Sequence, residues 1–159
     1  LLNVGAEEGK GNELVKEAYP LLKQCGVNFI GNVEGMDIPL GRANVIVTDG
    51  FIGNIIVKYS EGLGRVLQKW LTKELEGKLD QTELENTARK LYHSLSPAEV
   101  LGGGPLWGVN GVAAVAHGAS RAAQIAGTIR HTRQAVETGF VDILRVELEK
   151  AQAKIKHND

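Results

Sequence analysis

The stretch that decides the predicted fold is Asn44–Lys58, NVIVTDGFIGNIIVK. Its first apolar residues are β-branched and predict a short strand over Val45–Thr48, and a polar turn follows at Asp49-Gly50. After Gly53-Asn54 the apolar residues recur at helical spacing. A strand, a turn and a helix in this order are typical of ligand sites at the carboxyl edge of an α/β sheet.

The turn gathers polar groups that suit an anion. They are the Asp49 carboxylate, the Asn54 amide, the glycines Gly50 and Gly53, and the free N–H groups at the start of the helix. A structural alternative stays open, in which Asp49 caps the helix and the glycines make the turn. Caps are far commoner than active sites, so the motif alone does not decide between them.

Length and composition indicate one globular domain over residues 1–159. The hydrophobic content of 43% and charged content of 23% are ordinary for such a domain. A net charge of -1 without any cluster of Lys and Arg argues against nucleic-acid binding. The lone Cys25 excludes an internal disulfide framework and favours a reducing compartment. The sequence shows no signal peptide and no apolar run of the roughly 18 residues that a transmembrane helix needs.

The first half of the chain alternates predicted strands and helices. Strands are expected at Leu1–Val4, Val27–Ile30 and Val45–Thr48, and a helix from Asn12 to Cys25-Gly26 that Pro20 should kink or shorten. This order predicts a three-layer α/β/α arrangement around a mostly parallel sheet. Because the chain opens in a strand-like run without an initiator Met, we expect it to be a fragment of a longer protein.

Two amphipathic stretches predict a helical hairpin. Leu63–Leu75 and Leu84–Leu95 each carry an apolar stripe, with Gly77 as a stop and Asp80 with Glu83 as a capping box. The hairpin, about residues 61–95, should protrude from the sheet domain. Its stripe needs a partner, which is either a second copy or a missing part of the chain.

Residues 101–120, LGGGPLWGVNGVAAVAHGAS, predict two more strands. Gly102–Gly104 would allow close backbone approach, Leu106–Val109 and Val112–Ala116 would be the strands, and Ser120 would cap the next helix. That helix spans 121–138, and a last one follows Gly139.

Four polar loops follow predicted strands, at Gly5–Asn12, Gly31–Asp37, Asp49–Asn54 and His117–Ser120. In a parallel sheet they would converge on one edge. The candidate substrate-binding residues are Gly31, Asn32, Glu34, Asp37, Gly50, Gly53, His117 and Gly118. A structural role for His117, bonded to backbone, is as well supported as a functional one.

Several common sites are excluded. The GAEEGKGN loop has the wrong spacing for a P-loop, and its Glu7 and Glu8 would repel phosphate. The sequence also lacks a G-x-G-x-x-G fingerprint, an HExxH and a paired CxxC. We therefore expect neither a metal ion nor a cofactor.

An ordered set of segments carries a specific resemblance: GKGNELVKEAYPLL, NFIGNVEGMDI, ANVIVTDGFIGNIIVK, GGGPLWGVNGV and AHGAS. Together they resemble the C-terminal part of the bacterial phosphate acyltransferase (PlsX) family of phospholipid synthesis. The resemblance implies a fold similar to isopropylmalate dehydrogenase and phosphotransacetylase, and transfer of a fatty acyl group from acyl carrier protein to inorganic phosphate. It also implies a cytoplasmic homodimer with loose attachment to the inner face of the membrane. The family's N-terminal part is absent from the chain.

Such a reaction needs phosphate held, the thioester carbonyl polarised and the departing thiolate protonated or stabilised. Asn54 and the helix N–H groups suit phosphate or the oxyanion, and Lys58, one turn later, could supply positive charge. Asp49 would orient a lysine or the turn. The residues expected on the opposing wall are Asn32, Glu34 and Asp37.

Two rivals stay open. One is a phosphotransacetylase-like enzyme that uses acyl-coenzyme A, since the sequence does not separate the two donors or specify the acyl chain length. The other is a non-catalytic dimerisation or carrier-docking fragment. The hairpin is expected to form a dimer contact with its tip near the membrane, although Glu76–Gln81 offers Leu79 alone as an apolar anchor.

Overall fold

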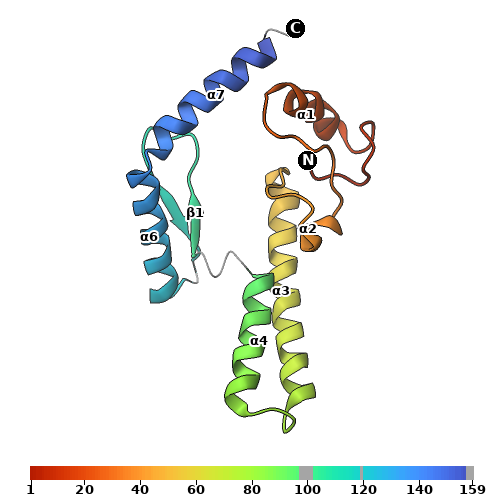
Figure 1. Ribbon diagram of the computed structural model, residues 1–159, viewed down its shortest axis with the longest axis vertical. Coiled ribbons are helices and arrows are strands. Elements are labelled where there is room, and N and C mark those ends of the chain that lie inside the picture. Colours follow the sequence, from red (N-terminus) through yellow and green to blue (C-terminus); the bar gives the residue numbers. More distant parts are fainter. Residues whose placement is uncertain (97–101, 119, 157–159) are drawn as a thin grey trace. The chain divides into compact units, whose positions relative to one another are not determined.

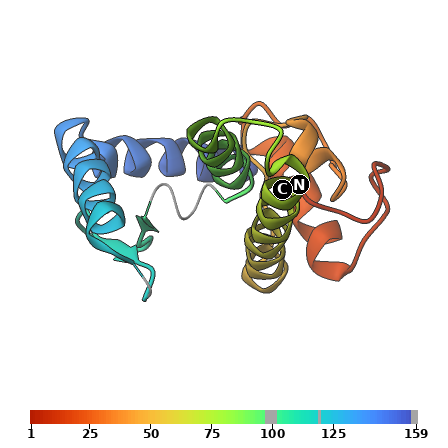
Figure 2. The ribbon, with the colours of Figure 1, turned by 90° about the horizontal axis from the view of Figure 1, so that it is seen from below.

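The computed structural model describes residues 1–96, 102–118 and 120–156. The chain divides into two compact units, residues 1–50 with 142–159 and residues 51–141 (Figures 1 and 2). The described residues form six helices and one two-stranded antiparallel sheet. The predicted mixed α/β class is therefore confirmed.

Three extended segments meet in the first unit. Leu2 and Val33 form a parallel bridge, in which Val33 N donates to Leu1 O and Asn3 N to Val33 O, both at 2.9 Å. Leu2 N donates to Val47 O, also at 2.9 Å. Leu1 and Val33 are buried there. The parallel pairing that the sequence predicts is thus present as a single bridge, and the sheet that the structure describes is antiparallel.

The strand predicted at Val27–Ile30 is wrong, because the pairing occurs at Val33. The backbone of the predicted strand turns on itself, since Phe29 N donates to Val27 O at 2.7 Å. This N–H group is therefore used locally rather than in a ladder. Val45–Thr48 is likewise not a strand, although Val47 contributes the carbonyl just described.

Three helices belong wholly or mainly to the first unit: α1 (Glu13–Gln24), α2 (Asp37–Leu40) and most of α7 (Phe140–Lys156). The Asn12 side chain caps α1 by accepting from Val15 N at 3.0 Å. Gly26, at φ +87°, follows the end of α1. Contrary to expectation, Pro20 does not shorten this helix.

The second unit begins with the predicted helix pair, α3 (Gly50–Leu75) and α4 (Gln81–Leu95). Asp80 caps α4 by accepting from Thr82 N and Glu83 N. The helices lie side by side (Figure 1), and a Cβ atom on Gly64 would lie 3.2–3.3 Å from Leu95, Ser96 and Tyr92. The two helices and the Asp80 cap of α4 were thus predicted correctly in this region.

The rest of this unit is a small sheet on a helix. Strands β1 (Gly103–Pro105) and β2 (Ala114–Ala116) pair with Gly104 opposite Val115, and both contact α6 (Ala122–Glu137). The predicted close approach is confirmed at Gly102 and Gly103, where a Cβ atom would lie 2.1 Å from Gln124 O and 2.6 Å from Val115 O, but not at Gly104, which has no neighbour within 4 Å.

Three details of this region were predicted wrongly. Leu106–Val109 is not a strand, because the chain leaves the ladder after Leu106 and Gly108 turns with φ +82°. The second strand is shorter than Val112–Ala116. Ser120 does not cap α6, since the cap residue is Arg121 and Ser120 Oγ instead donates to Gly102 O at 3.3 Å.

Candidate functional site

Helix α3 begins earlier than the sequence predicts. It starts at Gly50, directly after Asp49, so Gly53 and Asn54 lie inside its first two turns rather than in a preceding turn. The helix therefore includes both glycines of the predicted turn. Asn54 is exposed on the second helical turn of α3. Its predicted place, in a loop before the helix, is therefore wrong.

Lys58, one turn beyond Asn54, lies at the centre of a three-residue cluster. Its Nζ atom donates to Glu61 Oε2 at 2.9 Å and lies 3.2 Å from His117 Nε2. Lys58 is half-exposed, whereas the Glu61 side chain is 12% exposed. The cluster joins α3 to the end of β2. It brings together Lys58 and His117, two candidate residues that lie 59 positions apart in the sequence.

The small sheet fixes the backbone of His117. His117 N donates to Gly102 O at 3.4 Å, and its carbonyl accepts from Ser120 N at 2.9 Å. His117 directly follows β2 and is exposed, as is the adjacent Gly118. The backbone is therefore held while the ring remains accessible beside Lys58.

The first two predicted loops meet in the other unit. Asn32 Nδ2 donates to Glu7 O at 2.9 Å, and Asn3 Nδ2 donates to Lys10 O at 3.0 Å. Asn32 Oδ1 is buried and has no hydrogen-bond partner within the described part of the chain. Gly31, just before it, has φ +96°, a conformation that favours glycine.

Asp37 is tied to its own loop. Its Oδ2 atom accepts from Glu34 N at 2.9 Å, and its Oδ1 atom lies 3.2 Å from Arg42 Nη1. The Asp37 side chain is 8% exposed, while Arg42 is mostly exposed. The carboxylate therefore orders residues 34–42 and has little surface left for a ligand. Gly31–Asp37 and Lys58 with His117 fall in different units, so convergence of all four loops remains a prediction.

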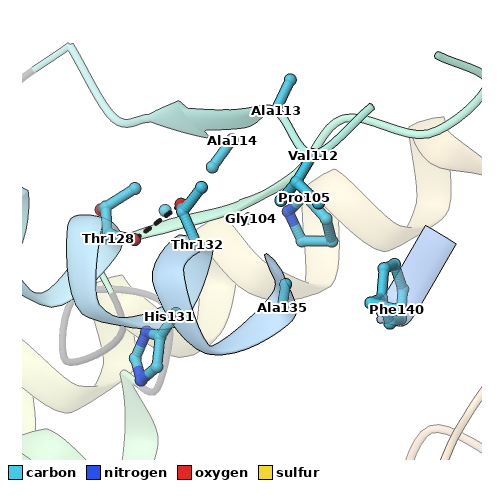
Figure 3. Close-up of a pocket in the computed structure, with 11 residues that line it drawn as sticks. Gly104, Pro105, Val112, Ala113, Ala114, Thr128, His131, Thr132, Ala135 and Phe140 are labelled. Carbon is cyan, nitrogen blue, oxygen red and sulfur yellow. Dashed lines mark hydrogen bonds between the residues drawn. The ribbon is translucent and has the colours of Figure 1, made fainter. Parts of the chain in front are cut away.

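An apolar cavity of about 160 Å³ lies between the sheet and α6 (Figure 3). Thr128 and Thr132 line it, but their hydroxyls donate to carbonyls one helical turn back, Gln124 O at 3.0 Å and Thr128 O at 2.8 Å. Its lining therefore suits apolar atoms rather than a charged ligand.

The described residues contain neither a metal-binding cluster nor a membrane-spanning helix. No group of three or more His, Cys, Asp or Glu side chains is arranged to hold a metal ion in residues 1–96, 102–118 and 120–156. Over the same residues, no helix is both long and apolar enough to cross a membrane.

Comparison with known proteins gives a consistent result. A family model described as "Fatty acid synthesis protein" matches residues 1–143. The chain belongs to this family. The chain is 39% identical, over 97% of its length and 48% of the relative's, to "Phosphate acyltransferase" of Elusimicrobium minutum. It is 45% identical, over 89% of its length and 43% of the relative's, to the protein of the same name from Heliobacterium modesticaldum.

Membership of the fatty acid synthesis protein family confirms the resemblance seen in the sequence. A third relative, "Phosphate acyltransferase" of Desulfitobacterium hafniense, is 40% identical over 96% of this chain and 47% of its own length. The chain therefore spans about half the length of the curated relatives that it matches.

In this family member, the sequence analysis missed Glu61. The signal was available, because Lys58 and Glu61 are three residues apart on a predicted helix, a spacing that allows an ion pair. What the spacing does not reveal is that the carboxylate is largely buried and that its lysine partner also reaches an imidazole.

Proposed function

We propose that this chain is part of an acyltransferase that moves a fatty acyl group from acyl carrier protein to inorganic phosphate. The acyl phosphate formed would serve phospholipid synthesis. The observation that carries the proposal is the Lys58–His117 contact at 3.2 Å, a paired ammonium and imidazole at a strand end. The names of the relatives, all "Phosphate acyltransferase", support the reaction class.

The proposed reaction is balanced without a cofactor. An oxygen of hydrogenphosphate attacks the thioester carbonyl carbon, a C–O bond forms, and the C–S bond breaks. The thiolate leaves and takes up one proton, and the phosphate loses one. A group that supplies this proton in the transition state accelerates the reaction by about 10²–10⁴-fold. Lys58 is assigned this role, with His117 beside it.

Other residues have supporting roles in the proposal. Asn54, which is exposed near the start of α3, stabilises the oxyanion or holds phosphate, where one donor contributes about 2.7–4 kcal/mol. Asp49 orients the start of this helix. Asn32 and Glu34 are proposed to contact substrate, and Asp37 acts by ordering its own loop.

The wider fold is also part of the proposal. A three-layer, isopropylmalate dehydrogenase-like domain is supported by the parallel bridge between Leu2 and Val33 and by the hydrogen bond from Leu2 to Val47. In such a sheet the strand ends that carry the loops would share one edge.

We further propose a cytoplasmic homodimer formed through α3 and α4, with peripheral contact to the inner face of the membrane at the hairpin tip. Leu63, Val66 and Trp70 support self-association, because they are 38%, 63% and 59% exposed at helical spacing along α3. Sedimentation of Trp70→Asp tests the dimer, since a charge there should split it and an unchanged dimer would refute the contact.

The decisive experiment measures acyl phosphate formation by the full-length native protein, with acyl carrier protein or coenzyme A carrying the same acyl group. Turnover with the carrier-protein donor is expected. Turnover with coenzyme A alone would favour the phosphotransacetylase-like alternative. Absence of product with both donors would overturn the proposal and leave a dimerisation or docking role.

A further inference from the structure

Glu61 differs from the acidic partners in four other short-range ion pairs of the described helices. In the pairs Glu13–Lys16, Arg133–Glu137, Asp142–Arg145 and Glu147–Lys150, the acidic side chain is between 61% and 86% exposed. The Glu61 side chain is 12% exposed. Exposed pairs contribute about 0–1 kcal/mol, whereas a carboxylate withdrawn from water must recover a desolvation cost. A helix-stabilising role alone does not explain why Glu61 is buried.

The lysine in this pair has a second contact that constrains the imidazole. An ammonium group has three N–H donors and no acceptor, so in a hydrogen bond across the 3.2 Å between Lys58 Nζ and His117 Nε2 the imidazole nitrogen is the acceptor. A neutral His117 then carries its proton on Nδ1. Glu61 and His117 together account for two of the three donors of Lys58.

We infer that Glu61 is a positioning residue that holds the Lys58 ammonium against His117, so that the third donor of Lys58 protonates the departing thiolate from a fixed position. The inference rests on the proposed function. A free lysine side chain has about 1.5–2 kcal/mol of rotamer entropy, which must be lost in any ordered transition state. The Glu61 carboxylate removes that freedom before substrate binds. The proton lost by hydrogenphosphate then restores the ammonium.

The test compares Glu61→Gln with Glu147→Gln in the full-length native protein. Both substitutions remove the charge of a glutamate that lies three residues from a lysine, but Glu147 belongs to an exposed pair in α7. For Glu61→Gln we expect kcat to fall about tenfold, with an unchanged KM for the acyl donor; the loss is smaller than the roughly 10²–10⁴-fold effect of a general acid because Lys58 itself is retained. Glu147→Gln should leave both constants unchanged.

A better leaving group separates positioning from a structural effect. The thiophenyl ester of the same fatty acid releases a thiolate that needs little protonation, so the defect of Glu61→Gln should shrink to less than about twofold of wild type. If Glu61→Gln lost the same factor in kcat with both acyl donors, or lost nothing with either, the positioning role of Glu61 would be overturned. Turnover by the wild-type protein would still uphold the proposed function. Absence of wild-type turnover would instead refute the proposed function.

An independent measurement covers the case in which Glu61→Gln fails to fold. Nitrogen-15 NMR of the wild-type protein reports which nitrogen of neutral His117 carries the proton. Protonated Nδ1 is the expected result, and Glu147→Gln should show the same tautomer. Protonated Nε2 would overturn the inference, because Lys58 could not then donate to it.

Discussion

The two units use their polar side chains differently. In the first unit, Asn32 donates to Glu7 O and Asp37 accepts from Glu34 N, so candidate side chains hold backbone. In the second, Lys58 faces Glu61 and His117 side chain to side chain. A side chain engaged with backbone shapes a site, whereas a cluster of mutually facing ionisable groups can move a proton. Acyl transfer is therefore expected to be most sensitive to substitutions in the second unit.

Gly102→Ala should have the largest effect. A Cβ atom would lie 2.1 Å from Gln124 O, and Gly102 has φ +80°. The left-handed conformation costs about 1–2 kcal/mol for a residue with a side chain, and overpacking adds about 1–3 kcal/mol. Because Gly102 O accepts from His117 N, both the free energy of unfolding and kcat should fall. Chemical denaturation and acyl phosphate assays measure them.

Gly104→Ala is the matched control for that change. It lies two residues along, within β1, and a Cβ atom there would have no neighbour within 4 Å. The free energy of unfolding should change by less than about 0.5 kcal/mol. An equal loss in both variants would show that the position of the glycine does not matter.

Lys58→Ala should lower the rate of acyl transfer and also cost some stability. Removal of the ammonium should lower kcat about 10²-fold, the lower end of general-acid effects. The substitution also leaves the largely buried Glu61 carboxylate without its lysine partner, so the free energy of unfolding should fall by about 1–3 kcal/mol. Lys150→Ala removes a comparable paired lysine from α7 and should leave kcat unchanged. Comparable rates in wild type and Lys58→Ala would contradict the proton-donor assignment.

Helices were more predictable than strands because their signals are local. Apolar spacing and the caps Asn12 and Asp80 place α1 and α4 within one or two residues. Strand pairing depends on distant partners. Val27–Ile30 has a strand-like composition, but its backbone turns on itself. Gly103–Pro105 has a composition that is unfavourable for a strand, yet it pairs, because glycine permits close approach to β2 and α6.

The candidate site was predictable in part for the same reason. The position of Lys58 follows from helical spacing, and that of His117 from its place after a strand. Asn54 was expected in the turn before α3 because Gly50 and Gly53 suggested a longer loop. In the structure the helix includes both glycines. The burial of Glu61 depends on tertiary packing, which no local spacing encodes.

Asp37→Asn should affect stability in the first unit. The largely buried carboxylate accepts from Glu34 N and pairs with Arg42, so loss of its charge should cost about 1–3 kcal/mol of unfolding free energy. Asp142→Asn is the control, because that aspartate also pairs with an arginine but is 82% exposed. It should cost less than about 0.5 kcal/mol. Equal costs, measured by denaturation, would refute the structural role of Asp37.

Asn32→Ala should have the smallest effect on stability. Asn32 is the first-unit candidate whose buried Oδ1 atom has no hydrogen-bond partner in the described residues, so this variant tests whether it binds a ligand. The substitution removes the hydrogen bond to Glu7 O, which contributes about 1 kcal/mol, but also removes a buried acceptor without a partner in the described residues. The two effects oppose each other, so the free energy of unfolding should change by less than about 1 kcal/mol.

The same variant should bind phosphate more weakly. If Asn32 Oδ1 accepts the hydroxyl of hydrogenphosphate, its loss should raise the KM for phosphate about fivefold, the equivalent of about 1 kcal/mol, and leave the KM for the acyl donor unchanged. Asn12→Ala is the control, since it removes the cap of α1 at a cost of about 0.5–2 kcal/mol and should not change the KM for phosphate. An unchanged KM in both variants would mean that Asn32, like Asp37, only holds backbone. The difference between the two units would then be complete, because every candidate side chain of the first would shape the site and the reacting groups would all lie in the second.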